Sequence, residues 1–150
     1  MKGVLRCHYD MLSFSVSERK KPGPSRRSSE ISFVIGKALE PAPRLENFPN
    51  TVIDVFIEIL QADASTRCAG INAASMALAA AGIPMNDLVA AVSIGKIGEK
   101  IVVDLTKEEE DYEEKGRKAS TDIPFAFLPR SGTISLLQLE ERVAVQSRHI

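Results

Sequence analysis

The chain has 150 residues, of which 44% are hydrophobic and 26% charged, a balance typical of a soluble globular domain with one core. Its formal net charge is −1, so any attraction to nucleic acid has to come from local patches. No apolar run approaches the roughly 18 residues of a membrane span, and the start of the chain lacks an apolar signal segment. The two cysteines have no zinc spacing and read as free thiols, so we expect a cytoplasmic protein without membrane contact.

The first third of the chain predicts a strand, a loop and a helix. Residues 4–11 form a mixed apolar run typical of a strand. Residues 13–25 form a polar loop, because the proline residues within it oppose regular structure. A helix follows, with Ser28 or Ser29 as its cap and Glu30 in its first turn. Its apolar residues recur at helical spacing until two prolines end it.

The middle of the chain predicts a strand followed by a closely packed helix. Residues 51–61 alternate, with isoleucine and valine on one face, as expected for a half-buried strand. Residues 66–81 are rich in alanine and carry Gly70, which favours a helix lying close to a sheet.

The last third predicts strands in pairs. Residues 88–94 pair with 101–105, and residues 123–128 pair with 133–139 across a glycine-containing turn. Between the pairs, the charged residues 107–120 are expected to be irregular. Strands and two helices in this order predict an α+β fold, a mixed β-sheet with helices on one face.

Three groups of side chains are candidates for chemistry. Ser65, Thr66 and Arg67 lie where the strand ends and the helix begins, so hydroxyls, a guanidinium and free N–H groups converge on what we interpret as a phosphate site. The alternative is an ordinary helix cap with a surface arginine. A second group consists of five cations around a proline-stiffened loop: Arg19, Lys20, Lys21, Arg26 and Arg27. They are suited to a phosphodiester backbone, and the alternative is that they only solvate the loop.

The third group is acidic. Asp104 ends a strand, and Glu110 and Asp111 follow within a run of acidic residues. A carboxylate at such a position can protonate a leaving oxygen or hold a divalent metal, and Asp104 with Glu110 is the pair we assign to Mg²⁺. The alternative is a charged, mobile surface loop.

Several ordered blocks of the chain resemble the RNase PH family, and within it the catalytic type of subunit of archaeal exosomes. The resemblance covers about residues 5–139. It is carried by residues 53–63, 72–75 and 81–85, and further by Phe14–Lys20, Arg26–Ser28, Lys37–Glu40, Val103–Leu105 and Ser135–Leu139.

The resemblance implies a fold and an activity. The fold is a partial RNase PH fold, similar to domain 2 of ribosomal protein S5. The activity is 3′→5′ phosphorolytic degradation of RNA, with inorganic phosphate as co-substrate and nucleoside diphosphates as products. Family members bind phosphate at the position of Ser65, where they have glycine, and of Thr66 and Arg67. An arginine pair at the position of Arg26 and Arg27 holds the 3′ end of RNA.

The resemblance also implies catalytic carboxylates and partners. Asp104 matches the first family aspartate, and Glu110 or Asp111 takes the place of the second. Family members assemble in a hexameric ring with a non-catalytic paralogue and RNA-binding cap subunits. The alternative function is a non-catalytic RNA-binding subunit of such a ring. Residues 1–139 are predicted to form an RNase PH-like domain lacking its N-terminal strands, and residues 140–150 a divergent tail in place of C-terminal helices. We therefore expect the chain on its own to be poorly stable, dependent on partners, or inactive.

Overall fold

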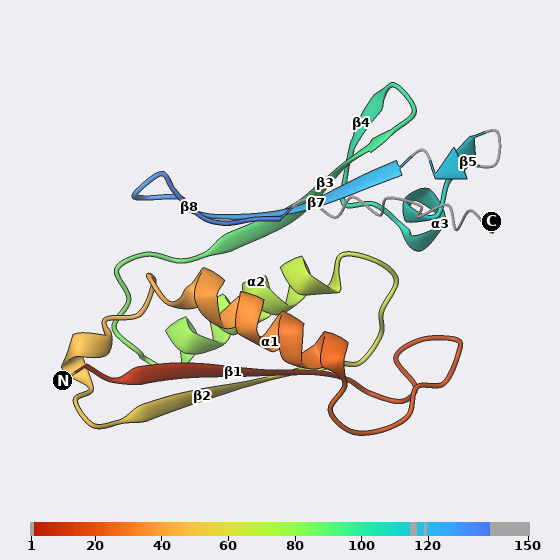
Figure 1. Cartoon of the computed structure of the whole chain (residues 1–150). Helices are drawn as coiled ribbons and strands as arrows, with labels where there is room; N and C mark the ends of the chain where they lie inside the picture. The colour runs from red at the N-terminus through yellow and green to blue at the C-terminus, as the bar shows by residue number, and fades with distance from the viewer. Residues whose placement is uncertain (1, 115–116, 119, 139–150) are drawn as a thin grey trace, which may run out of the picture.

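The computed structural model describes residues 2–114, 117–118 and 120–138, and its elements form three layers (Figure 1). A two-stranded sheet of β1 and β2 forms one outer layer, α1 and α2 form the middle layer, and a second sheet covers the other side of the helices. None of the helices in this described part combines the length and apolar character needed to cross a lipid bilayer. The tail predicted over 140–150 lies outside the described residues.

The first sheet pairs β1 (Val4–Met11) with β2 (Val52–Ile59) in parallel. The bounds of β1 are those predicted, and β2 lies inside the predicted range. The alternation of β2 is also confirmed, because Val55, Ile57 and Ile59 are buried while the residues between them are exposed.

Helix α1 (Arg26–Leu39) begins earlier than the sequence predicted, and the prediction of Ser28 or Ser29 as its cap is wrong. Ser25 is the N-cap: its hydroxyl accepts a bond from the Ser28 backbone N–H at 3.0 Å, and the Ser28 hydroxyl accepts from the Ser25 backbone N–H at 2.7 Å. Arg26 therefore opens the helix rather than closing the loop. Glu30 consequently lies beyond the first turn, which contains no acidic residue. The helix ends before Pro41, as predicted, and the short η1 (Leu45–Asn47) follows.

Helix α2 (Thr66–Ala80) lies against α1 and β2, and Gly70 explains the close approach. A Cβ at Gly70 would stand 3.1 Å from Ile35 Cδ1 and 3.3 Å from Ile57 Cγ2. The fully buried Ile31, Ile35 and Ile71 form the centre of the core between the layers. The prediction of a closely packed helix with small residues is confirmed.

The second sheet is antiparallel, with strand order β4-β3-β7-β8. Its strands are β3 (Ala90–Ile97), β4 (Lys100–Val103), β7 (Ser120–Leu128) and β8 (Thr133–Leu137). Both predicted strand pairs, β3 with β4 and β7 with β8, are confirmed. The α+β class is confirmed as well, but the β1-β2 sheet and the β4-β3-β7-β8 sheet are separate, each covered on one face by the helices, rather than one mixed sheet.

The charged segment between the pairs is more regular than predicted. It contains α3 (Lys107–Glu110), β5 (Glu113–Glu114) and β6 (Arg117–Lys118). The Thr106 hydroxyl accepts from the Glu109 backbone N–H at 3.3 Å, while the Glu109 carboxylate accepts from the Thr106 N–H at 2.9 Å. This reciprocal capping box starts the short helix, and its Thr-x-x-Glu pattern is present in the sequence.

Candidate active site

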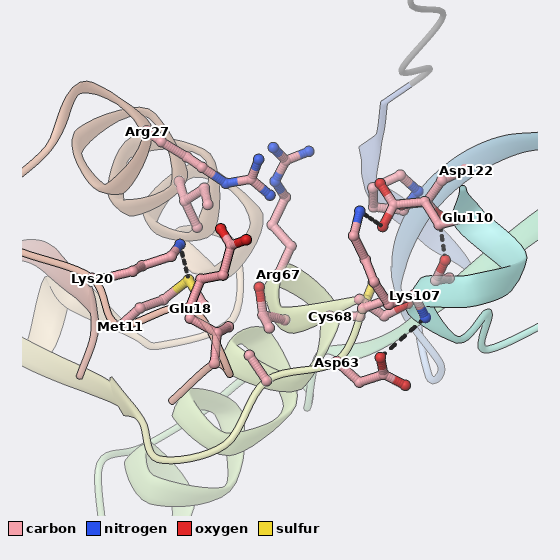
Figure 2. A pocket seen from close by; sticks show the side chains of 18 of the residues that line it. Met11, Glu18, Lys20, Arg27, Asp63, Arg67, Cys68, Lys107, Glu110 and Asp122 are labelled. Atoms are coloured by element: carbon pink, nitrogen blue, oxygen red, sulfur yellow. Dashed lines mark hydrogen bonds and ion pairs between the residues drawn. The ribbon is translucent and has the colours of Figure 1, made fainter. Parts of the chain in front are cut away.

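A cavity of about 570 Å³ opens where the first turns of α1 and α2 face α3 and β7 (Figure 2). Cationic side chains come from the loop before α1 and from α1, α2 and α3. Carboxylates come from the loops before α1 and α2 and from α3 and β7. The cavity is lined by residues from segments far apart in sequence: Met11, Val16–Lys20, Arg27, Ile31, Ala62–Cys68, Ser93, Lys107, Glu110, Asp122 and Pro124.

Ser65 is the N-cap of α2 and has an unusual backbone conformation. Its φ is 55° and its ψ is 22°, in the left-handed region that favours glycine. Its side chain makes no cap hydrogen bond, and its Oγ is buried without a hydrogen-bond partner. The structure therefore does not have an ordinary side-chain cap at Ser65, and the Ser65 hydroxyl is left buried without a hydrogen-bond partner.

Thr66 is held by a residue of the first sheet. The Tyr9 hydroxyl donates to Thr66 Oγ1 at 2.8 Å, and the tyrosine itself is only 4% exposed. Burial raises the pKa of Tyr9, so its hydroxyl keeps the proton that it donates. A hydroxyl that accepts one bond still has its own O–H to give. The arrangement thus makes the Thr66 hydroxyl available as a donor at the helix N-terminus.

Arg67 is buried, with 7% of its surface exposed, yet it lines the cavity. Its Nη1 donates to Gln138 Oε1 at 2.9 Å, and its Nη2 lies 3.6 Å from Glu30 Oε1. The alternative of a surface arginine at this position is therefore wrong. An unexposed guanidinium at a helix N-terminus gives the cavity a fixed positive charge.

The basic loop contributes several of its predicted cations to the cavity. Arg19, Lys20 and Arg27 line it, whereas Arg26 does not. Neighbouring residues of a helix point about 100° apart, so only one of the two arginines in the first turn of α1 faces the cavity. Figure 2 shows the Arg27 side chain extending from α1 toward that of Arg67, and Lys20 donating to Met11 Sδ at 3.2 Å.

Of the predicted carboxylates, Glu110 lines the cavity, and Lys107 stands beside it (Figure 2). The Lys107 Nζ is 3.0 Å from Asp111 Oδ1 and 3.5 Å from Glu110 Oε2, and the hydrogen bond to Asp111 raises the pKa of Lys107. The Lys107 backbone N–H donates to Asp63 Oδ1 at 3.1 Å, which joins α3 to the loop before α2. Asp111 is exposed and does not line the cavity.

Asp104 lies outside the cavity. It is exposed just after β4 with a φ of 60°, and its backbone N–H donates to Ser93 O at 2.8 Å.

Asp122 on β7 also lines the cavity, and sequence reasoning missed it. The Ser93 hydroxyl donates to it. Asp122 and Pro124 are two residues apart on β7, so they lie on the same face of the strand, and both line the cavity. This two-residue spacing is the signal from which the sequence could have indicated Asp122.

The side chains that the sequence assigned to Mg²⁺ do not come together, because Asp104 is absent from the cavity that Glu110 lines. Among residues 2–114, 117–118 and 120–138, no three His, Cys, Asp or Glu side chains gather as metal ligands. Cys68 lines the cavity, and burial raises its pKa to about 11, so the thiol is protonated at neutral pH. Among the described residues, the site thus combines an anion cradle with four lining carboxylates, those of Glu18, Asp63, Glu110 and Asp122, and no metal cluster.

Comparisons with known proteins identify the family of the chain. Residues 1–84 match the model of the 3′ exoribonuclease family, domain 1, and residues 87–148 match that of domain 2 of the same family. The chain is 61% identical over 139 residues to the exosome complex component Rrp41 of Pyrococcus furiosus, covering 93% of this chain and 53% of that protein. It is 52% identical over 138 residues to Rrp41 of Nitrosopumilus maritimus, covering 92% of this chain and 54% of that protein.

A solved structure shares the fold. Rice (Oryza sativa) Rrp46 superposes with a TM-score of 0.77 at 19% identity, over 94% of this chain and 61% of the rice chain. The chain spans about half the length of the curated relatives it matches, at 53% and 54% of the two Rrp41 proteins. On the two domain matches, the chain belongs to the 3′ exoribonuclease family, that of RNase PH.

Proposed function

We propose that this chain forms the phosphate-binding part of an exosome subunit that shortens RNA from its 3′ end by phosphorolysis. The observation that carries the proposal is the buried Arg67 at the N-terminus of α2, in a cavity whose opposite wall carries Glu110 and Asp122. Phosphorolysis needs a bound inorganic phosphate and a proton for the departing oxygen of the RNA. In this proposal the wall with Arg67 binds the phosphate, and the wall with Glu110 and Asp122 supplies the proton.

Inorganic phosphate as co-substrate would bind at the start of α2. Thr66 offers a donor hydroxyl, Arg67 offers a guanidinium, and the helix dipole adds positive potential. Ser65 adds a hydroxyl of its own, but its left-handed backbone makes it a poorer residue than glycine at this point. These three residues hold the phosphate as a nucleophile facing the last phosphodiester of the RNA.

The RNA 3′ end would enter past the basic loop. Arg19, Lys20 and Arg27 line the same cavity and are suited to phosphodiester oxygens, which carry no sequence information. Arg26 would meet the RNA backbone outside the cavity. Degradation without sequence preference follows from contacts of this kind.

We assign the general acid to the carboxylates of the opposite wall. In this proposal Asp122, held by the Ser93 hydroxyl, takes the role that the sequence gave to Asp104, and Glu110 remains the second carboxylate. One of them, in its protonated form, gives its proton to the 3′ oxygen that leaves when phosphate attacks. No step is routed through Mg²⁺, since no three His, Cys, Asp or Glu side chains of the described residues gather as metal ligands.

The wider setting is part of the same proposal. The resemblance to Rrp41 proteins supports a ring that this chain shares with a non-catalytic RNase PH-like paralogue, with RNA-binding cap subunits above it, in the cytoplasm. Such a ring would give the RNA its path to the cavity.

The test is phosphorolysis of a 5′-labelled oligoadenylate by this chain mixed with its ring paralogue. Shortening that requires inorganic phosphate and releases ADP supports the proposal, and Asp122→Asn is expected to abolish it while Asp104→Asn retains it. Loss of shortening with Asp104→Asn but not with Asp122→Asn would return the acid role to Asp104.

A second candidate is a non-catalytic RNA-binding subunit, favoured by the strained Ser65 at the centre of the phosphate cradle. In that case the same assay shows salt-sensitive binding of the labelled RNA without any release of ADP.

A further inference from the structure

The guanidinium of Arg67 is held by side chains from two other elements. Gln138, directly after β8, accepts from Nη1 at 2.9 Å, and Glu30 on α1 lies 3.6 Å from Nη2. The backbone N–H of Gln138 donates to Pro124 O at 3.2 Å, so Gln138 is itself fixed to β7. A cavity-lining cation on α2 is thereby connected to the second sheet.

We infer that Gln138 is a positioning residue, which orients the Arg67 guanidinium for inorganic phosphate. The inference rests on the proposed function, since it names how the phosphate site of that function is kept in shape. Gln138 is not among the cavity-lining residues and acts through Arg67 alone.

The planarity of the guanidinium explains how the bond to Gln138 can orient it. Its five N–H donors lie in a rigid fork, so fixing Nη1 on one side sets the direction in which the rest of the fork points. The Arg67 side chain is only 8% exposed, so its stem has little freedom to compensate for a lost bond. A phosphate recognised by this fork then meets donors already in place.

The two neighbours of Arg67 are predicted to have opposite effects. Gln138 is neutral and orients the guanidinium without cancelling its charge. Glu30 is a carboxylate with 48% of its side chain exposed, and at 3.6 Å it weakens the positive potential felt by an anion more than it fixes geometry. Removing the Gln138 acceptor is therefore expected to weaken phosphate binding, and removing the Glu30 charge to strengthen it.

The experiment is calorimetric titration of the full chain with inorganic phosphate. Gln138→Leu keeps the size of the side chain and removes the acceptor, and it is expected to weaken phosphate binding about tenfold, the effect of one hydrogen bond to a charged group. Glu30→Gln is expected to strengthen binding about threefold. Gln61→Leu, at an exposed residue outside the cavity, is the matched control and is expected to bind as the unaltered chain does. Thermal unfolding of each variant shows that the fold is retained.

A thermodynamic cycle separates orientation from general damage. Since Gln138 acts through Arg67, Gln138→Leu is expected to have no further effect on phosphate binding once Arg67→Lys is present. An equal loss of phosphate affinity from Gln138→Leu with and without Arg67→Lys would overturn the inference. Unchanged phosphate affinity in Gln138→Leu, or no phosphate binding by the unaltered chain, would overturn it as well.

The inference and the proposed function fail separately. Phosphorolysis by the ring with an unchanged KM for phosphate in Gln138→Leu would refute the inference and leave the function standing. Phosphate binding that depends on Gln138, in a ring that never releases ADP, would refute the function and support the inference.

Discussion

The Tyr9 hydroxyl donates to Thr66 Oγ1 at 2.8 Å, so the first strand of the chain holds the first residue of the helix that carries the candidate phosphate site. Tyr9 pairs with Ile57 within the parallel sheet, and its ring belongs to the core. A residue of the core therefore reaches the functional cavity through a single hydrogen bond.

Removing that hydroxyl tests the connection. We expect Tyr9→Phe to lower the free energy of unfolding by about 1 kcal/mol, because the ring still packs and only one hydrogen bond is lost. Phosphate affinity should fall severalfold, since Thr66 is no longer held. Urea unfolding and phosphate titration measure the two effects. The matched control is Tyr112→Phe, at a residue 45% exposed, whose unfolding free energy should change by less than about 0.5 kcal/mol. An equal loss in both variants would speak against a role for the Tyr9 hydroxyl.

Replacing Ser65 by glycine is expected to stabilise the chain. The left-handed φ of 55° costs a serine about 1 kcal/mol that glycine does not pay, and the buried, unpartnered Oγ adds to the cost. Ser65→Gly should therefore raise the midpoint of urea unfolding and tighten phosphate binding. Ser65→Ala removes the hydroxyl but keeps the backbone strain, so its unfolding midpoint should lie between the two. A midpoint for Ser65→Gly below that of the unaltered chain would show that the hydroxyl contributes more than the strain costs.

Two glycines in helices provide a matched pair for packing. A methyl group at Gly70 meets Ile35 and Ile57 at 3.1 and 3.3 Å, so we expect Gly70→Ala to destabilise the chain by about 1–3 kcal/mol. A methyl group at Gly36 in α1 meets only Cys7 atoms at 4.0 Å, so Gly36→Ala should stabilise it by about 1 kcal/mol through helix propensity. Thermal unfolding compares them, and a stabilised Gly70→Ala would mean that α2 is less tightly packed than the structure has it.

The Arg6–Asp54 pair predicts a pH dependence. Two hydrogen bonds of 2.8 Å from Arg6, followed by one with His8, lower the pKa of Asp54 from 3.8 to about 2. A carboxyl whose folded-state pKa is lowered stabilises the fold above its unfolded pKa and loses that contribution as pH falls toward the folded value. The stability difference between the unaltered chain and Arg6→Met should thus be present at pH 6 and disappear between about pH 4 and pH 2.

Urea unfolding across this pH range measures the difference. Because the Arg6 side chain is 56% exposed, the difference should be small and should shrink further with added salt. A difference that persists unchanged at pH 2 would assign the effect of Arg6 to packing rather than to its pairing with Asp54.

Patterns within single segments of the sequence predicted most of the helices and strands. The features that the sequence did not predict depend on contacts formed in the folded structure. Alternation identified the inward face of β2, and small residues identified α2, because both signals lie within one element. The start of α1 was missed because several serines compete for the cap, and only the reciprocal bonds of Ser25 and Ser28 decide among them.

The candidate site shows the same limit. Ser65, Thr66 and Arg67 were found because they follow one another at a strand-to-helix turn. Asp122 was not found, because strand alternation places it on one face of β7 but does not show that this face packs against the start of α2. The bonds of Arg67 to Gln138 and to Glu30 likewise join residues distant in the chain.

The parallel pairing of β1 and β2 has a consequence for how the protein folds. Val4 lies opposite Val52, so the two strands cannot begin as a hairpin and meet only after the long segment between them, α1 included, has closed into a loop. Contacts of such sequence separation slow folding. Tyr9 reaches Thr66 only when this loop has closed, so we expect the phosphate cradle to be among the last parts of the chain to become ordered after synthesis.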